Sequence, residues 1–172
     1  HEYLNLYRNV AMAATEFEAE HRDLHIRLGG PALAWAFTYR FGEFNWSQQF
    51  LKDINTEKIK LDFIGIHYYG NISPIRGDRK DNAYPTFSEM YAKLREWRNQ
   101  YTPEAKICVT EWGGSYHTDL TEKSMLHNGG NVAASFAASF LYQMFVEGVD
   151  EALYLVTTDL RQNKDGEWLN IW

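Results

Sequence analysis

The feature that most limits what this chain can fold into is the alternation of short apolar runs with amphipathic stretches. The apolar runs predict strands, and apolar residues repeating every three or four positions predict helices between them. The predicted strands are His25–Gly30, Leu61–Tyr68, Ile107–Thr110 and Glu151–Thr157. The predicted helices are Tyr3–Glu20, Ser47–Ile54, a stretch starting at Pro85 and Thr86, and Asn131–Glu147. A helix followed by strand–helix three times and a last strand is typical of a parallel α/β sheet covered by helices.

The spacing of the predicted strands indicates a barrel. Their ends fall near Gly30, His67, Glu111 and Thr157, which are 37, 44 and 46 residues apart. Such spacings suit barrel units with elaborated loops. The Gly29-Gly30-Pro31 run predicts a sharp backbone turn after the first strand. No linker or low-complexity segment interrupts the pattern, so we expect residues 1–172 to form a single domain.

Composition excludes several classes of function. A formal net charge of -6 argues against a nucleic-acid binder, which needs a basic footprint. No apolar run approaches the roughly 18 residues that a membrane span requires. The single cysteine excludes an intrachain disulfide and a cysteine zinc cluster. Because the six histidines are scattered and no Gly-rich phosphate loop occurs, we expect neither a metal nor a cofactor.

Polar residues gather directly after the predicted strands, and Glu111 is the most informative of them. It follows the apolar run Ile107–Thr110 and precedes Trp112 and two glycines. A charged residue is seldom buried at a strand end without a partner or a chemical task. One interpretation is an ion pair with a strand-end cation such as Arg27. The favoured interpretation is attack on the anomeric carbon of a sugar, because the carboxyl ends of parallel strands carry the chemistry in α/β folds.

Four stretches then resemble a known family, in the right order along most of the chain. They are Glu2–Val10 (EYLNLYRNV), Leu28–Ala32 (LGGPA), Asp62–Tyr69 (DFIGIHYY) and Val109–Tyr116 (VTEWGGSY). Together they resemble glycoside hydrolase family 39, which includes β-xylosidases, α-L-iduronidases and exopolysaccharide hydrolases. The resemblance implies an α/β fold, a (β/α)8 TIM barrel of which this chain supplies about strands five to eight. It also implies a retaining glycoside hydrolase with Glu111, at the end of strand seven, as the nucleophile.

The resemblance suggests further substrate-binding residues on the same cleft. A His or Tyr at the end of strand six, His67 or Tyr68, is expected to contact the sugar or to orient the nucleophile and keep it ionised. The alternative for His67 is an imidazole satisfied by a backbone carbonyl. Candidate stacking platforms are Trp35, Trp112 and Tyr116, for which the alternative is core or loop packing. Asp159 is a candidate ligand of a sugar hydroxyl or, equally, the cap of a loop.

Two departures from the family pattern stand out. The general acid/base glutamate, in an Asn-Glu-Pro stretch after strand four, is absent, and no Asn-Glu dipeptide occurs anywhere in the chain. Relatives place a Trp in strand eight, and Leu155 is closest to that position here. Because His1 already stands in a helix pattern, we expect the sequence to begin in mid-fold, with the acid/base glutamate upstream.

A half-barrel leaves two sheet edges unpaired and cannot close alone. The missing N-terminal half-barrel belongs to the same protein, or is supplied by a second chain, or two copies dimerise edge to edge; we favour the first. The predicted partner is a carbohydrate, and a polysaccharide substrate favours a secreted or periplasmic protein. The alternative function is a non-catalytic carbohydrate-binding or structural barrel fragment, in which Glu111 only accepts hydrogen bonds from sugar hydroxyls.

Overall fold

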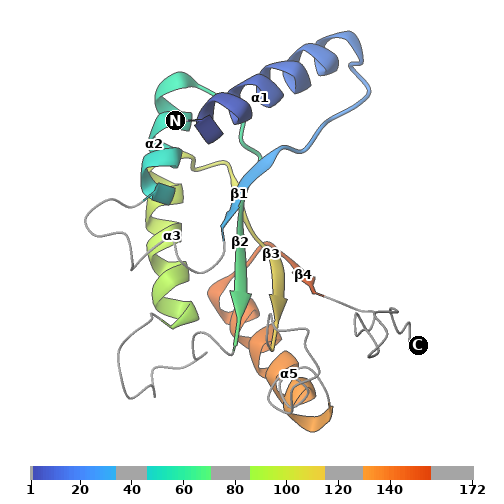
Figure 1. The fold of residues 1–172 in the computed structure, drawn as a ribbon, viewed down its shortest axis with the longest axis vertical. Coiled ribbons are helices and arrows are strands. Elements are labelled where there is room, and N and C mark those ends of the chain that lie inside the picture. The colour runs from blue at the N-terminus through green and yellow to red at the C-terminus, as the bar shows by residue number, and fades with distance from the viewer. Residues whose placement is uncertain (1, 34–45, 71–85, 115–129, 156–172) are drawn as a thin grey trace, which may run out of the picture.

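The computed structural model describes residues 2–33, 46–70, 86–114 and 130–155. Four strands form one parallel sheet in chain order (Figure 1): β1 (Gly29–Leu33), β2 (Phe63–Tyr69), β3 (Lys106–Gly113) and β4 (Glu151–Tyr154). The helices are α1 (Glu2–Glu20), α2 (Trp46–Glu57), α3 (Phe87–Tyr101) and α5 (Gly130–Glu147). The predicted order of elements and the parallel α/β sheet are confirmed.

The first strand lies later in the sequence than predicted. The expected strand was His25–Gly30 followed by a break, whereas β1 begins at Gly29 and includes Pro31. Proline cannot donate to a sheet ladder, but it is tolerated at a bulge, and the register of β1 against β2 shifts between Pro31 and Leu33. Just before β1, the backbone N–H of Leu28 donates to the Asp62 carboxylate at 2.8 Å. The Gly-Gly-Pro run therefore belongs to the strand.

Helix α3 begins where the sequence predicted, because the residues at its start form a capping box. Thr86 is the N-cap, and its side chain accepts a hydrogen bond from the backbone N–H of Glu89. The Glu89 carboxylate in turn accepts from the Thr86 backbone N–H at 2.7 Å. This reciprocal capping box satisfies two N–H groups that the helix itself leaves unpaired.

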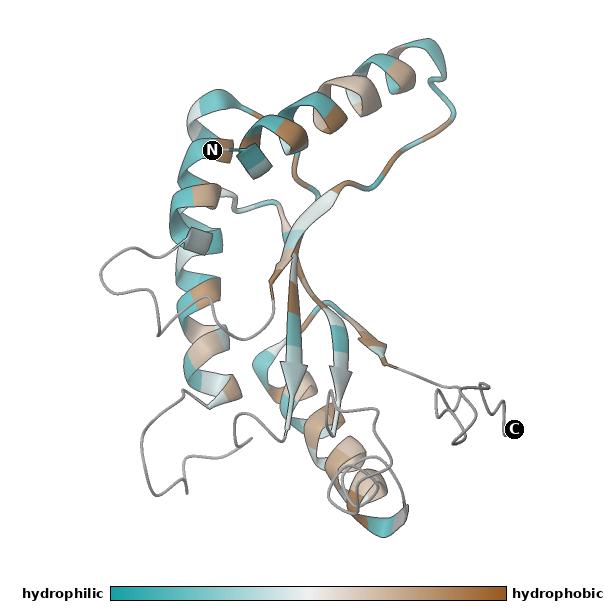
Figure 2. Ribbon diagram, in the orientation of Figure 1, coloured by the Kyte–Doolittle hydropathy of each residue, from teal (hydrophilic) through white to brown (hydrophobic). Residues whose placement is uncertain are grey.

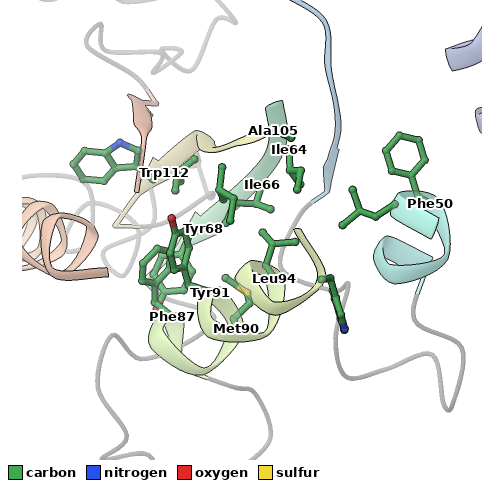
Figure 3. Close-up of a cluster of buried hydrophobic side chains, with 14 of the residues drawn as sticks. Phe50, Ile64, Ile66, Tyr68, Phe87, Met90, Tyr91, Leu94, Ala105 and Trp112 are labelled. Atoms are coloured by element: carbon green, nitrogen blue, oxygen red, sulfur yellow. The ribbon is translucent and has the colours of Figure 1, made fainter. Parts of the chain in front are cut away.

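The hydrophobic core lies between one face of the sheet and the helices. The register pairs the core residues of β2 with those of β3: Ile64 with Ile107, Ile66 with Val109, and Tyr68 with Trp112. The helix residues that pack against them are Tyr7, Phe50, Leu51, Ile54, Phe87, Met90, Leu94, Phe140 and Met144. Figure 3 shows part of this cluster, including Phe50, Phe87, Met90 and Leu94 from the helices. We call the opposite face of the sheet the inner face. It carries Phe63, Gly65, His67 and Tyr69 of β2.

The helices differ in how apolar they are. Figure 2 shows polar and apolar residues alternating along α1, α2 and α3, whereas α5 is mostly apolar. Much of that apolar surface of α5 is exposed, and the Phe145 side chain is 83% exposed. Within the described ranges, no helix combines the length and the hydropathy needed to cross a membrane.

Candidate active site

The position of Glu111 on the inner face depends on one extra residue in β3. Ile107 and Val109 face the helices, so strict alternation would turn Glu111 toward the helices as well. The register instead passes from Ile66↔Val109 to His67↔Glu111, leaving Thr110 as an additional residue. This β-bulge reverses the alternation beyond it. Glu111 therefore lies on the inner face, level with His67 of β2.

Two side chains of β2 meet one oxygen of the Glu111 carboxylate. The Tyr69 hydroxyl donates a hydrogen bond of 2.7 Å to Glu111 Oε2. The His67 Nδ1 lies 3.2 Å from the same oxygen. The Glu111 side chain keeps 36% of its surface exposed, and that of His67 keeps 18%. The carboxylate is thus held by its neighbours and remains accessible from the inner face.

Both neighbours of Glu111 are uncharged near neutral pH. Burial lowers the pKa of His67 below its ordinary value, and the Glu111 carboxylate only partly opposes this effect. Burial, together with the hydrogen bond to Glu111, raises the pKa of the Tyr69 phenol. A neutral imidazole and a neutral phenol fix the position of a carboxylate without cancelling its charge.

The structure rules out the ion pair with Arg27 as the purpose of Glu111. Arg27 lies at the opposite end of the sheet, where its Nη2 is 2.8 Å from Glu151 Oε1. Among the described residues, Glu111 forms no ion pair with a lysine or an arginine. Glu111 thus stands at the C-terminal end of a parallel strand with neutral partners among the described residues, which makes it a candidate for catalysis.

Comparison with known proteins agrees with this geometry. A family model described as the glycosyl hydrolase catalytic core matches residues 8–147. The chain belongs to this family. None of the curated proteins matches the sequence. The match begins within α1 and ends with α5, so it includes β2 and β3, the strands that carry the described site residues.

Solved structures of glycosidases share the fold of this glycosyl hydrolase core. A family 39 β-xylosidase from Caulobacter crescentus is 21% identical, with a TM-score of 0.65 over 92% of this chain and 29% of its own. A glucosidase from Croceicoccus marinus is 19% identical, with a TM-score of 0.62 over 88% and 27%. A family 39 enzyme from Xanthomonas axonopodis pv. citri is 21% identical, with a TM-score of 0.61 over 92% and 29%.

The chain thus spans less than a third of the length of these relatives. The sequence-based prediction of part of a (β/α)8 barrel, similar to family 39, is confirmed as a likeness of fold. The single-domain organisation of residues 1–172 stays a prediction.

Two predicted sugar contacts lie in the core instead of beside Glu111. The Tyr68 side chain is fully buried and stacks on Phe140 at a centroid distance of 4.6 Å. Trp112 is 4% exposed and packs edge-on against Tyr154 at 4.7 Å. Both residues sit one position from a site residue, so the alternation of a strand turns them toward the helices, as Figure 3 shows. The structure therefore places both side chains in the core, on the face of the sheet opposite Glu111.

Sequence reasoning missed Tyr69, the residue that holds Glu111. The signal was available, because Tyr69 stands two positions after His67 and residues two apart in a strand share a face. The predicted strand ended at Tyr68, one residue before the observed end of β2. The remaining candidates, Trp35, Tyr116 and Asp159, lie outside the described residues.

A metal centre would need several ligating side chains close together. The described residues contain no group of three or more His, Cys, Asp and Glu side chains arranged to hold an ion.

Proposed function

We propose that this chain carries the nucleophile of a retaining glycoside hydrolase, and that Glu111 is that nucleophile. The observation that carries the proposal is the environment of the Glu111 carboxylate. The side chain is 36% exposed on the inner face, and its Oε2 lies 2.7 Å from the Tyr69 hydroxyl and 3.2 Å from His67 Nδ1. It stands at the C-terminal end of a parallel strand, where barrel enzymes place their active sites. Membership of the glycosyl hydrolase catalytic core family supports the same reaction class.

The geometry suggests different roles for the two oxygens of the Glu111 carboxylate, one in positioning and one in attack. Within the described part of the chain, both contacts fall on Oε2, so Oε1 is the oxygen left for attack. In the first step, the bond from Oε1 to the anomeric carbon forms while the bond to the leaving oxygen breaks. A second carboxylic acid, about 5–5.5 Å from the first, protonates that leaving oxygen. The same group then takes a proton from the water that hydrolyses the glycosyl ester.

We further propose that the second carboxylic acid comes from a preceding half of the barrel in the same protein. The outer strands β1 and β4 are unpaired on one side within the described sheet. Apolar side chains are exposed near both edges: Leu6, Val10 and Phe17 on α1, and Leu141, Phe145 and Leu153 on α5 and β4. Four further strands with their helices would pair the edges and bury these side chains.

The test uses 2-fluoro glycosides with dinitrophenyl leaving groups, incubated with the native protein and followed by intact mass and peptide mapping. So good a leaving group needs little help from an acid, so the experiment isolates the nucleophile. We expect a stable glycosyl adduct on Glu111 with at least one sugar of the panel. The adduct should be absent in Glu111→Gln and present in Glu151→Gln, which removes a carboxylate from the other end of the sheet.

The alternative, a barrel that binds carbohydrate without hydrolysing it, predicts a different result. It is favoured by one observation, namely that the chain contains no Asn-Glu dipeptide, the pattern in which the resemblance to family 39 places the general acid/base glutamate. Such a protein would bind sugars and form no adduct with any member of the panel. That outcome would withdraw Glu111 as a nucleophile.

A further inference from the structure

The pairings of β3 with β2 and with β4 both show one extra residue in β3. On the β2 side, one step from Ile66 to His67 matches two steps in β3, from Val109 to Glu111. On the β4 side, two steps from Ala152 to Tyr154 match three steps, from Val109 to Trp112. The two intervals share residues 109–111, so the bulge lies at Thr110 and precedes the candidate nucleophile directly.

The Thr110 side chain ties this bulge to the adjacent strand. Its hydroxyl donates a hydrogen bond of 3.2 Å to the backbone carbonyl of Ile66. Ile66 is the last residue of β2 before the register shift. A regular parallel ladder contains only backbone bonds, so this link exists because the bulge brings a hydroxyl to the neighbouring strand.

Gly65 leaves the space that the Thr110 side chain occupies. A Cβ at Gly65 would lie 3.3 Å from both Cγ2 and Oγ1 of Thr110, closer than a Cβ normally approaches another heavy atom. The same Cβ would lie 3.3 Å from the Cα of Ala32, the extra residue in β1 between Pro31 and Leu33. Thr110 thus packs over a glycine on the inner face, the face that carries His67 and Glu111.

We propose that Thr110 is a positioning residue, which locks the β3 bulge through its hydroxyl and so holds Glu111 against Tyr69 and His67. The proposal rests on the proposed function, since it concerns the orientation of the nucleophile. It follows from the alternation of strands, because without the extra residue Glu111 would turn toward the helices and Trp112 toward the inner face. Thr110 touches no reacting atom and acts only through Glu111.

The first test measures the rate at which the 2-fluoro glycoside labels Glu111, separated into a binding constant and a maximal rate. Thr110→Val keeps the shape and removes the hydroxyl, and Thr110→Ser keeps the hydroxyl. We expect Thr110→Val to lower the maximal rate about three- to tenfold, the worth of one hydrogen bond, with little change in binding. Thr110→Ser should restore the wild-type rate. A loss of thermal stability with unchanged labelling would overturn the proposal.

A second measurement does not depend on activity. Nuclear magnetic resonance follows the titration of His67, assigned with His67→Gln, and the Glu111 carboxylate raises the pKa of this imidazole. If Thr110 holds Glu111 beside His67, the pKa of His67 falls in Thr110→Val, in the same direction as in Glu111→Gln, and not in Thr110→Ser. An unchanged titration in Thr110→Val contradicts the proposal, even where no glycoside labels the protein.

Gly65→Ala provides a variant in case Thr110→Val does not fold. It leaves the hydroxyl in place and crowds the Thr110 side chain by a few tenths of an ångström. We expect the labelling rate and the pKa of His67 to change in the same direction as in Thr110→Val, by a smaller amount. Wild-type values of both quantities in this variant would count against the bulge as the device that positions Glu111.

Discussion

Two carboxylates on strands of the same sheet have opposite surroundings. At the N-terminal end, Glu151 Oε1 lies 2.8 Å from Arg27 and 3.2 Å from Lys106. At the C-terminal end, Glu111 has a phenol and an imidazole as its neighbours. Hydrogen bonds from Arg27 and then from Lys106 lower the pKa of Glu151. One carboxylate is neutralised by full positive charges, and the other is only oriented.

This difference separates a structural carboxylate from a candidate nucleophile. A carboxylate paired with two cations has little tendency to attack carbon, because its electron density is already engaged. A carboxylate held by neutral donors keeps its charge and its free oxygen. Under the proposed function, the N-terminal end of the sheet contributes to stability and the C-terminal end carries the chemistry, as in parallel barrels generally.

Removing the candidate nucleophile should have the largest effect. We expect Glu111→Gln to lower the rate of glycoside cleavage by about 10⁴-fold or more, because the variant lacks the carboxylate proposed to form the glycosyl ester. Thermal unfolding should change little, since the amide retains an acceptor for the Tyr69 hydroxyl. The rate is measured with dinitrophenyl glycosides in the native protein. Retention of most of the activity in this variant would mean that the two carboxylates do not differ in the way proposed.

Sequence patterns predicted the C-terminal end of the sheet better than the N-terminal end. The pattern around Glu111 was recognisable because it is local, an apolar strand followed directly by a charged residue. The pairing of Arg27 with Glu151 joins residues 124 positions apart, and nothing local marks it. The sequence also allowed a pair between Arg27 and Glu111, because sequence alone does not show which carboxylate lies beside Arg27.

Two residues that were expected in the site lie instead on the face of the sheet that the helices cover. Tyr68 and Trp112 were expected beside the carboxylate, because they adjoin His67 and Glu111 in the chain. Their burial follows from side-chain alternation in β2 and from the bulge at Thr110 in β3. A bulge is fixed by cross-strand register, which only the folded sheet shows.

Removing the Tyr69 hydroxyl, which donates to Glu111, should have the next largest effect on the rate of cleavage. Tyr69→Phe removes a hydrogen bond to a charged acceptor, worth about 1.5–3 kcal/mol, so we expect kcat to fall about 10- to 100-fold. Tyr91→Phe is the matched control, since the Tyr91 hydroxyl donates to the Gly148 carbonyl at 2.9 Å and burial raises its pKa to about 12. That control should lower stability and leave kcat unchanged. Equal kcat values in the two variants would assign Tyr69 a packing role only.

The lowered pKa of His67 predicts a smaller, pH-dependent effect on stability. In the unfolded chain this imidazole takes up a proton at its ordinary pKa, whereas the folded protein resists protonation to a lower pH. The folded state therefore binds fewer protons in that window, and stability falls as the pH drops through it. The free energy of unfolding, measured in urea at neutral and at mildly acidic pH, should differ less between the two pH values in His67→Gln than in wild type. It should show a larger one in Glu111→Gln, which lacks the charge that raises this pKa.

The smallest effect is expected at the N-terminal end, from Glu151→Gln. The pairs with Arg27 and Lys106 are exposed, so they stabilise the fold weakly and are screened by salt. Because the folded pKa of Glu151 is lowered, its contribution is present above the ordinary glutamate pKa and is lost as the pH falls through the folded value. The melting temperature of Glu151→Gln should therefore lie slightly below that of wild type at neutral pH and low salt, and the two should converge in acid.

The activity of Glu151→Gln decides whether the two ends are independent. We expect the rate of glycoside cleavage to stay within about twofold of wild type, because distant sites without shared partners contribute additively. A loss approaching that of Glu111→Gln would mean that the charges of the N-terminal end reach the reacting carboxylate through the sheet. The ion pairs of Arg27 and Lys106 would then belong to the catalytic machinery, and the division of the sheet into a stabilising end and a reactive end would be wrong.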